Sequence, residues 1–201
     1  MNKFHNIVSI IFQPFLMPTY GALLLVNLDA FNSLMLFTKA IIVGGTSLFT
    51  GIMPALPILL MLKSGEVNDL FISRREERTI PYLFAFFSYV VYTFFLYKVV
   101  HFPMFIVAMG IGVSISILLI TLINLKWKIS AHLSGIGGLV GGIFGISYRM
   151  GYNHLGLLIT ILAISALVAL SRIELKAHTP GQTLAGFLLG FITVFIPCFF
   201  L

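Results

Sequence analysis

The sequence predicts an all-α fold, a polytopic transmembrane bundle of about six to seven helices, each formed by roughly 20 apolar residues. Of the 201 residues, 59% are hydrophobic and 9% are charged, and the mean hydropathy is +1.08. A soluble domain carries roughly 25% charged residues. The charges are clustered, and nearly every stretch between two clusters is long enough to cross a bilayer. We therefore expect an integral membrane protein that is surrounded by membrane lipids.

Seven apolar segments follow one another along the chain. They cover 7–26, 34–62, 81–97, 103–123, 133–148, 155–170 and 181–201. The first contains Pro14 and Pro18 and has no cleavage site of small residues after it, so we expect a retained, kinked helix. The second carries three glycines and two prolines within 44–57, so we expect it to be kinked or broken. The third and fourth begin at Pro81 and Pro103, which suit the first turn of a helix.

Glycines at helical spacing mark the fifth and seventh segments. In the fifth, Gly138, Gly142 and Gly145 would share one face of a helix, and the seventh has Gly186 and Gly190 four residues apart. Small residues let helix backbones approach closely in lipid. We expect these two helices to pack closely and to bring their polar ends together, and an oligomer through such glycine-rich faces stays open.

The short loops leave room for one domain only, over 1–201. It consists of N-terminal helices (1–62), a basic loop (63–78) and a helical core that carries the motifs described below (81–201). Its one cysteine, Cys198, excludes a disulfide within the chain.

Counting the crossings places three loops on one face of the membrane, namely 63–78, 124–132 and 171–180. Most of the basic residues belong to this face: Lys63, Arg74, Arg75, Arg78, Lys126, Lys128, Arg172 and Lys176. A net charge of +6 that is confined to short loops points to anionic headgroups or phosphate and not to nucleic acid. We expect a bacterial cytoplasmic (inner) membrane protein, and the side that this face occupies stays open.

Two segments on this face carry side chains that can hold and attack a phosphate. Segment 171–182 reads SRIELKAHTPGQ, in which Arg172 can contact two phosphate oxygens at once, and Ser171 and His178 are further groups of the kind that hold and attack a phosphate. Segment 128–135 reads KISAHLSG and adds His132. Ionisable groups at such positions of a membrane protein indicate function by default. The other histidines, by contrast, look like interface residues with polar partners: His5, His101 and His154.

The stretch 171–190 resembles the third signature of the type 2 phosphatidic acid phosphatase superfamily. That signature is Ser-Arg, five residues, His, three residues and Asp, followed by a Gly-rich helix. Ser171, Arg172 and His178 fall at the matching spacings, whereas Gln182 stands in place of the Asp.

Segment 128–135 resembles the second signature of the same superfamily, which is usually Pro-Ser-Gly-His. Ser130 and His132 match it, and Ile129 and Ala131 replace the Pro and the Gly.

The first signature, Lys with Arg-Pro seven residues on, is not present in that form. Near its usual place stand only Lys126 and Lys128, while Arg78-Thr-Ile-Pro81 is a relaxed version of it elsewhere on the same face.

The resemblance implies that His178 attacks phosphorus and becomes phosphorylated, that His132 protonates the leaving oxygen, and that neither a metal nor a cofactor takes part. The family's Asp orients the nucleophilic His. Gln182 can accept a hydrogen bond from the ring but brings no negative charge, so we expect either weak phosphatase activity or Glu174 in the orienting role. The residues expected to bind phosphate are Arg172, Ser171, Ser130, Lys128, Lys126 and Arg78.

The predicted function is the removal of phosphate from a lipid phosphate or polyprenyl diphosphate. The alternative is a non-catalytic relative that binds lipid phosphate or serves an assembly, and a third hypothesis is a small transporter. All six acidic residues lie in predicted loops, which disfavours a proton-coupled transporter. The lack of paired Asp-rich motifs for magnesium disfavours a prenyltransferase.

Overall fold

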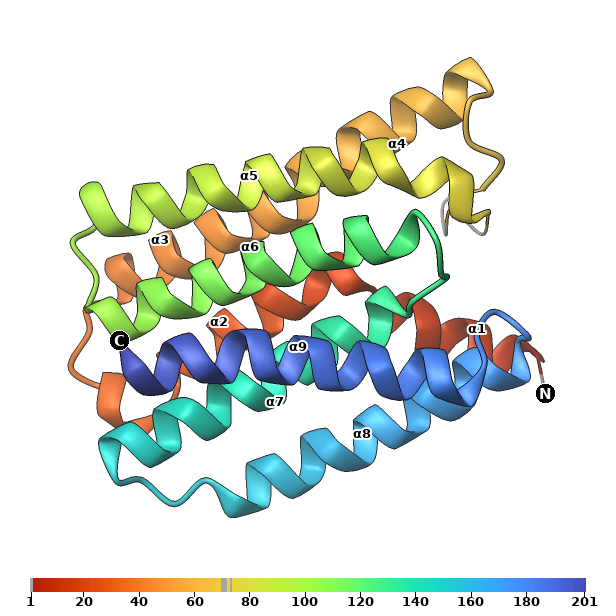
Figure 1. Cartoon of the computed structure of the whole chain (residues 1–201). Coiled ribbons are helices and arrows are strands. Elements are labelled where there is room, and N and C mark those ends of the chain that lie inside the picture. Colours follow the sequence, from red (N-terminus) through yellow and green to blue (C-terminus); the bar gives the residue numbers. More distant parts are fainter. Residues whose placement is uncertain (1, 70–71, 73) are drawn as a thin grey trace.

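The computed structural model describes residues 2–69, 72 and 74–201, and within them every regular element is a helix (Figure 1). The predicted all-α bundle is therefore confirmed. The α-helices are α1 (Asn2–Ile11), α2 (Met17–Val26), α3 (Leu36–Thr46), α4 (Met53–Ser64), α5 (Thr79–Lys98), α6 (Met104–Asn124), α7 (Ala131–Met150), α8 (Leu155–Glu174) and α9 (Pro180–Phe200). Short 3₁₀ turns cover Pro14–Leu16, Asp29–Phe31 and Arg75–Arg78, and a π-helical turn covers Ser47–Ile52.

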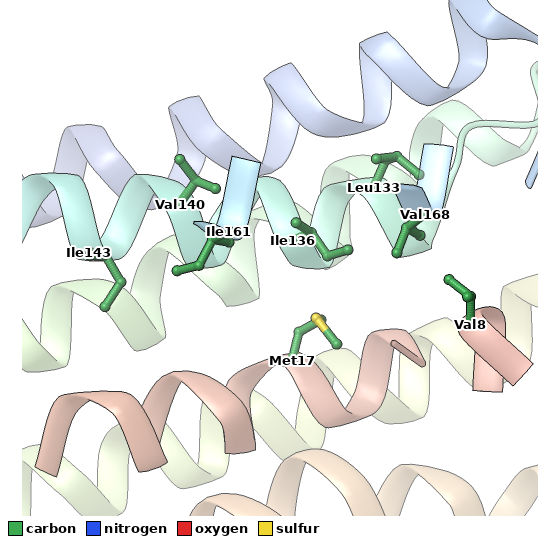
Figure 2. Packing of buried hydrophobic residues seen from close by; sticks show 8 residues of the cluster. All are labelled: Val8, Met17, Leu133, Ile136, Val140, Ile143, Ile161 and Val168. Atoms are coloured by element: carbon green, nitrogen blue, oxygen red, sulfur yellow. The ribbon is translucent and has the colours of Figure 1, made fainter. Parts of the chain in front are cut away.

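Six helical stretches of the described chain are long and apolar enough to cross a membrane, which makes this an integral membrane protein. Helix α7 is not among them, because glycines and serines lower its hydropathy. It lies inside the bundle instead, packed against α9, α8, α2 and α6. Figure 2 shows part of this core, where Val8 of α1 and Met17 of α2 face residues of α7 and α8.

The first N-terminal segment, predicted as a kinked helix, is divided into two helices, and the second, predicted as kinked or broken, is one helix with a local irregularity. The 3₁₀ turn that starts at Pro14 separates α1 from α2, because proline cannot donate a helical hydrogen bond. The π-helical turn Ser47–Ile52 joins α3 to α4, and such turns occur where a helix is locally widened.

Helices α7 and α9 pack backbone against backbone through their glycines. A Cβ atom on Gly137 would collide with the carbonyl oxygen of Phe187, one on Gly186 with that of Ser130, and one on Gly190 with that of Ser134. The predicted close packing is confirmed. These faces are occupied within the chain itself, so an oligomer built on them remains a prediction only.

We expect Gly190→Ala to lower the free energy of unfolding by about 2 kcal/mol or more, because a Cβ that meets backbone cannot be accommodated by a side-chain rotation. Gly156→Ala is the control, since a Cβ at Gly156 meets nothing within 4 Å. Thermal unfolding in detergent measures both, and equal stability of the two variants would contradict the close contact.

The three basic loops meet at one end of the bundle, which we call the motif end (Figure 1, right). The Asn124 side chain donates a hydrogen bond to the carbonyl of Arg75 at 2.9 Å, and the amide of Ser130 donates to the carbonyl of Gln182 at 3.3 Å. The loops therefore lie at one end of the bundle, and their common position on one face of the membrane stays a prediction.

Candidate functional site

The turn between α8 and α9 holds Arg172 and His178 together. The amides of Ala177 and His178 both donate to the carbonyl of Arg172, at 3.0 and 3.2 Å, and Lys176 adopts a left-handed conformation with φ of 53°. Both functional side chains are buried, with exposed fractions of 6% for Arg172 and 7% for His178. Both line the same internal cavity, so the spacing that singled them out in the sequence places them side by side.

Gln182 orients the His178 ring. Its Oε1 lies 3.1 Å from Nδ1 of the ring and also accepts the amide of Thr179 at 3.2 Å, while the Thr179 hydroxyl accepts the amide of Gln182 at 3.4 Å. This reciprocal pair is a capping box at the start of α9. Because an amide oxygen only accepts, Nδ1 carries the ring proton and Nε2 keeps the lone pair. Glu174, the alternative orienting residue, is exposed to solvent.

Burial lowers the pKa of His178 to about 3, and the charge of Arg78 acts in the same direction. The hydrogen bond that the ring donates to Gln182 raises the pKa but does not overcome the effect of burial. The ring is therefore neutral at physiological pH, which is the form that can attack an electrophile.

Arg78 joins this site from the basic loop. It is 4% exposed, lines the same cavity, and its Nε donates to the carbonyl of Ile72 at 2.7 Å. Its charge acts on both His178 and Arg172. Nε of Arg172 is buried and has no hydrogen-bond partner in the described part of the chain. Two guanidinium groups facing one cavity can bind an anion.

His132 and Ser130 lie at the start of α7. The His132 ring lines the cavity, and its Nε2 lies 3.2 Å from the carbonyl of Ser9. A carbonyl only accepts, so this nitrogen is the donor. Ser130 precedes α7, lies next to Gln182, and its buried hydroxyl has no partner within the described residues.

The two lysines of the same loop differ in their position. Lys128 is half-buried, and its pKa is lowered by burial and then by the charges of Arg78 and Arg172. It therefore lies close to both arginines. Lys126 is exposed and is not among the residues that line the cavity.

Ser171 faces away from the cavity. Its hydroxyl donates to the carbonyl of Leu167 at 2.9 Å and lies 3.1 Å from Nδ1 of His5. The structure thus brings together Arg78, Lys128, Ser130, His132, Arg172, His178 and Gln182. It does not bring Ser171 or Lys126 to them.

Two further residues of the site were not identified from the sequence. Tyr82 lines the cavity and is close enough to Arg78 and Arg172 for their charges to act on it. It follows Arg78 by four residues, a spacing that places two side chains on one helix face and could have revealed it. Gln13 also lines the cavity, with a buried Oε1 that lacks a partner among the described residues, and no sequence pattern marks it.

We expect Arg78→Gln to lower anion binding at the site strongly, because a buried charge that faces the cavity is removed. Arg74→Gln is the control, since 70% of the Arg74 side chain is exposed. Titration of each purified variant with an alkyl phosphate measures the difference, by calorimetry. Equal losses in both variants would mean that the loop acts as a diffuse patch of charge.

Across the described residues, the His, Cys, Asp and Glu side chains form no group of three that could hold a metal ion. Comparisons with protein-family models, with curated proteins and with solved structures found no match for this chain.

Proposed function

We propose that this protein is an integral membrane phosphatase that removes phosphate from a lipid phosphate or polyprenyl diphosphate, without a metal or a cofactor. One observation carries the proposal: a neutral, buried His178 with its Nε2 lone pair lies beside Arg172 and Arg78 at the end of a cavity within membrane helices. The same residues underlie the resemblance to the type 2 phosphatidic acid phosphatases. We further propose the bacterial inner membrane as its location.

In the proposed reaction, the Nε2 lone pair of His178 forms a bond to phosphorus while the bond from phosphorus to the lipid oxygen breaks. The leaving oxygen takes up a proton, the role that the resemblance implies for the protonated ring of His132, and His132 regains that proton from the water of the next step. Water then cleaves the phosphorus–nitrogen bond, which releases inorganic phosphate and returns the ring to its neutral form. Charge on the phosphoryl oxygens would be stabilised by Arg172 and Arg78, because catalysis of phosphoryl transfer is mostly positioning and electrostatic stabilisation.

The direct test is phosphate release by the purified protein in detergent, with a panel of lipid phosphates and diphosphates and with EDTA present. We expect release to continue in EDTA. Release that requires an added divalent cation, or no release from any member of the panel, would contradict the proposal.

Two observations favour a second candidate, a non-catalytic protein that binds lipid phosphate. Gln182 gives His178 no negative charge to stabilise a cationic ring. Nε2 of His132 is held by the carbonyl of Ser9, so only its other ring nitrogen could serve a leaving group. Binding of lipid phosphate without turnover would support this candidate.

We expect Gln182→Glu to separate the two candidates. A glutamate keeps the length that the capping box needs, and its carboxylate would raise the pKa of His178 from about 3 by favouring the charged ring. In a working phosphatase the rate should rise, plausibly about tenfold, since each 1.36 kcal/mol off the barrier is a factor of ten.

The sign of the pH effect follows from the same change. A raised pKa leaves less neutral ring at low pH, so the acid limb of the pH–rate profile should move to higher pH in Gln182→Glu. Gln182→Asp restores the family's residue but shortens the side chain, and serves as the comparison. A variant that stays inactive at every pH would favour the binding protein.

A further inference from the structure

An internal cavity continues from the candidate site toward the opposite end of the bundle. Its polar end is formed by Arg78, Arg172 and His178, and its far end reaches Leu96 and Ile106. Between these ends, its walls come from α2, α3, α5, α6, α7 and α9 and are mostly apolar. The cavity thus joins a cationic end to a long hydrophobic interior.

The cavity extends along most of the membrane-spanning length. On α5, the cavity is lined from Tyr82 to Leu96. On α6, which packs against α5, it is lined from Ile120 to Ile106. At a rise of 1.5 Å per residue, each pair is separated by roughly 21 Å. That is about two thirds of the roughly 30 Å hydrocarbon core of a bilayer.

The polar side chains in the middle of the cavity wall have hydrogen-bond partners within the protein. Tyr89, Thr50 and Thr93 donate to backbone carbonyls. The Tyr92 hydroxyl lies 2.8 Å from that of Thr46, and the Ser116 hydroxyl lies 2.9 Å from that of Ser134. These groups have no need of a polar occupant. At the cationic end, in contrast, Nε of Arg172 has no partner among the described residues.

The width of the cavity suits one hydrocarbon chain. The space open to the centres of water-sized groups is about 200 Å³. Over a length of roughly 21 Å, this leaves a cross-section of roughly 10 Å² for those centres. Two chains do not fit side by side in that cross-section, because their contacting carbon atoms stay about 3.5–4.0 Å apart.

We propose that this cavity holds the hydrocarbon chain of a single-chain lipid phosphate, with the phosphate at Arg172 and the tail inside the bundle. The inference rests on the proposed function and names its substrate class. The tail would lie between the helices, and a two-chain lipid would have to leave one chain outside. An isoprenoid phosphate and a straight alkyl phosphate both have the required chemistry, a single apolar chain bonded to a phosphate.

A block in the middle of the cavity tests this. Val113 of α6 lines the cavity halfway along it, whereas Ile115, two residues away, is exposed on the outer face of the helix. Val113→Trp should shorten the cavity, and Ile115→Trp is its matched control. Ala22→Phe narrows the cavity from α2 and provides a second block should Val113→Trp fail to fold.

The probes are hexyl, dodecyl, hexadecyl and geranylgeranyl phosphate, together with a two-chain phosphatidic acid. Binding is measured by calorimetry in detergent, and phosphate release is measured in parallel. We expect the wild type and Ile115→Trp to bind the long single chains more tightly than the hexyl chain. In the blocked variants, the long chains should lose about tenfold or more in affinity, while hexyl phosphate binds as before.

The inference would be overturned if Val113→Trp and Ile115→Trp bound every chain length with the same affinity. It would also be overturned if the two-chain phosphatidic acid bound as tightly as the long single-chain phosphates. The two readouts keep this outcome apart from failure of the proposed function. If affinity depends on chain length but no phosphate is released, the cavity assignment is supported and the proposed hydrolysis is contradicted. Phosphate release from the long chains at the same rate in the blocked variants as in the wild type would support hydrolysis and contradict the cavity assignment. Whichever of geranylgeranyl and hexadecyl phosphate binds with the higher affinity shows whether the natural chain is an isoprenoid or a straight alkyl chain.

Discussion

His178→Ala is expected to abolish phosphate release, with a loss on the order of a thousandfold or more, because it removes the nucleophile itself. The fold should survive, since Gln182 still accepts the Thr179 amide and closes the start of α9. Wild-type protein quenched in acid with labelled substrate should retain an acid-labile phosphoenzyme, and the alanine variant should retain none.

His154→Ala is the control for this experiment. His154 lies at the other end of the bundle, before α8, where it is bonded to Ser147 at 2.8 Å. It should keep wild-type turnover. Turnover of His178→Ala at the wild-type rate would exclude the phosphohistidine mechanism.

Arg172→Lys is expected to impair turnover strongly although it keeps the charge. The guanidinium of Arg172 is buried and offers a planar, two-pronged donor that an ammonium cannot replace. Loss of one such contact costs roughly 2–4 kcal/mol in the transition state by analogy with single oxyanion-hole donors. This corresponds to a rate reduction of about thirtyfold to a thousandfold.

The comparison for this variant is Arg149→Lys, because Arg149 lies at the far end of the bundle and donates to the carbonyl of Phe199. The kcat/KM of Arg149→Lys should equal that of the wild type. A fully active Arg172→Lys variant would show that Arg172 only anchors the loop to lipid headgroups.

Much of the helical framework was predictable because membrane helices leave a direct signal in hydropathy. The spacing of Arg172 and His178 was equally informative, since both belong to one tight turn and need no distant contact to meet. The close approach of α7 and α9 could also be predicted, because Gly186 and Gly190 leave no side chain to keep the backbones apart.

Other features depended on contacts that no local pattern encodes. Ser171 precedes Arg172 directly, yet it lies on the other face of α8 and bonds to His5. Lys126 and Lys128 are equivalent in the sequence, but the irregular turn leaves the first exposed and the second half-buried. The central cavity lies between α2, which packs against α3 and α7, and the paired helices α5 and α6, and neither composition nor periodicity describes that arrangement.

The weak hydropathy of α7 has a consequence for how the protein is made. A segment enters a bilayer according to the apolar character of its own residues, and α7 falls short of the other helices in this respect. Its backbone is covered by α9, which the ribosome synthesises two helices later. Until α9 arrives, the helix that carries His132 lacks the neighbour with which it makes its most extensive contact. Chains that end before α9 should therefore leave α7 poorly inserted and open to degradation, which a glycosylation-mapping assay on truncated chains would reveal.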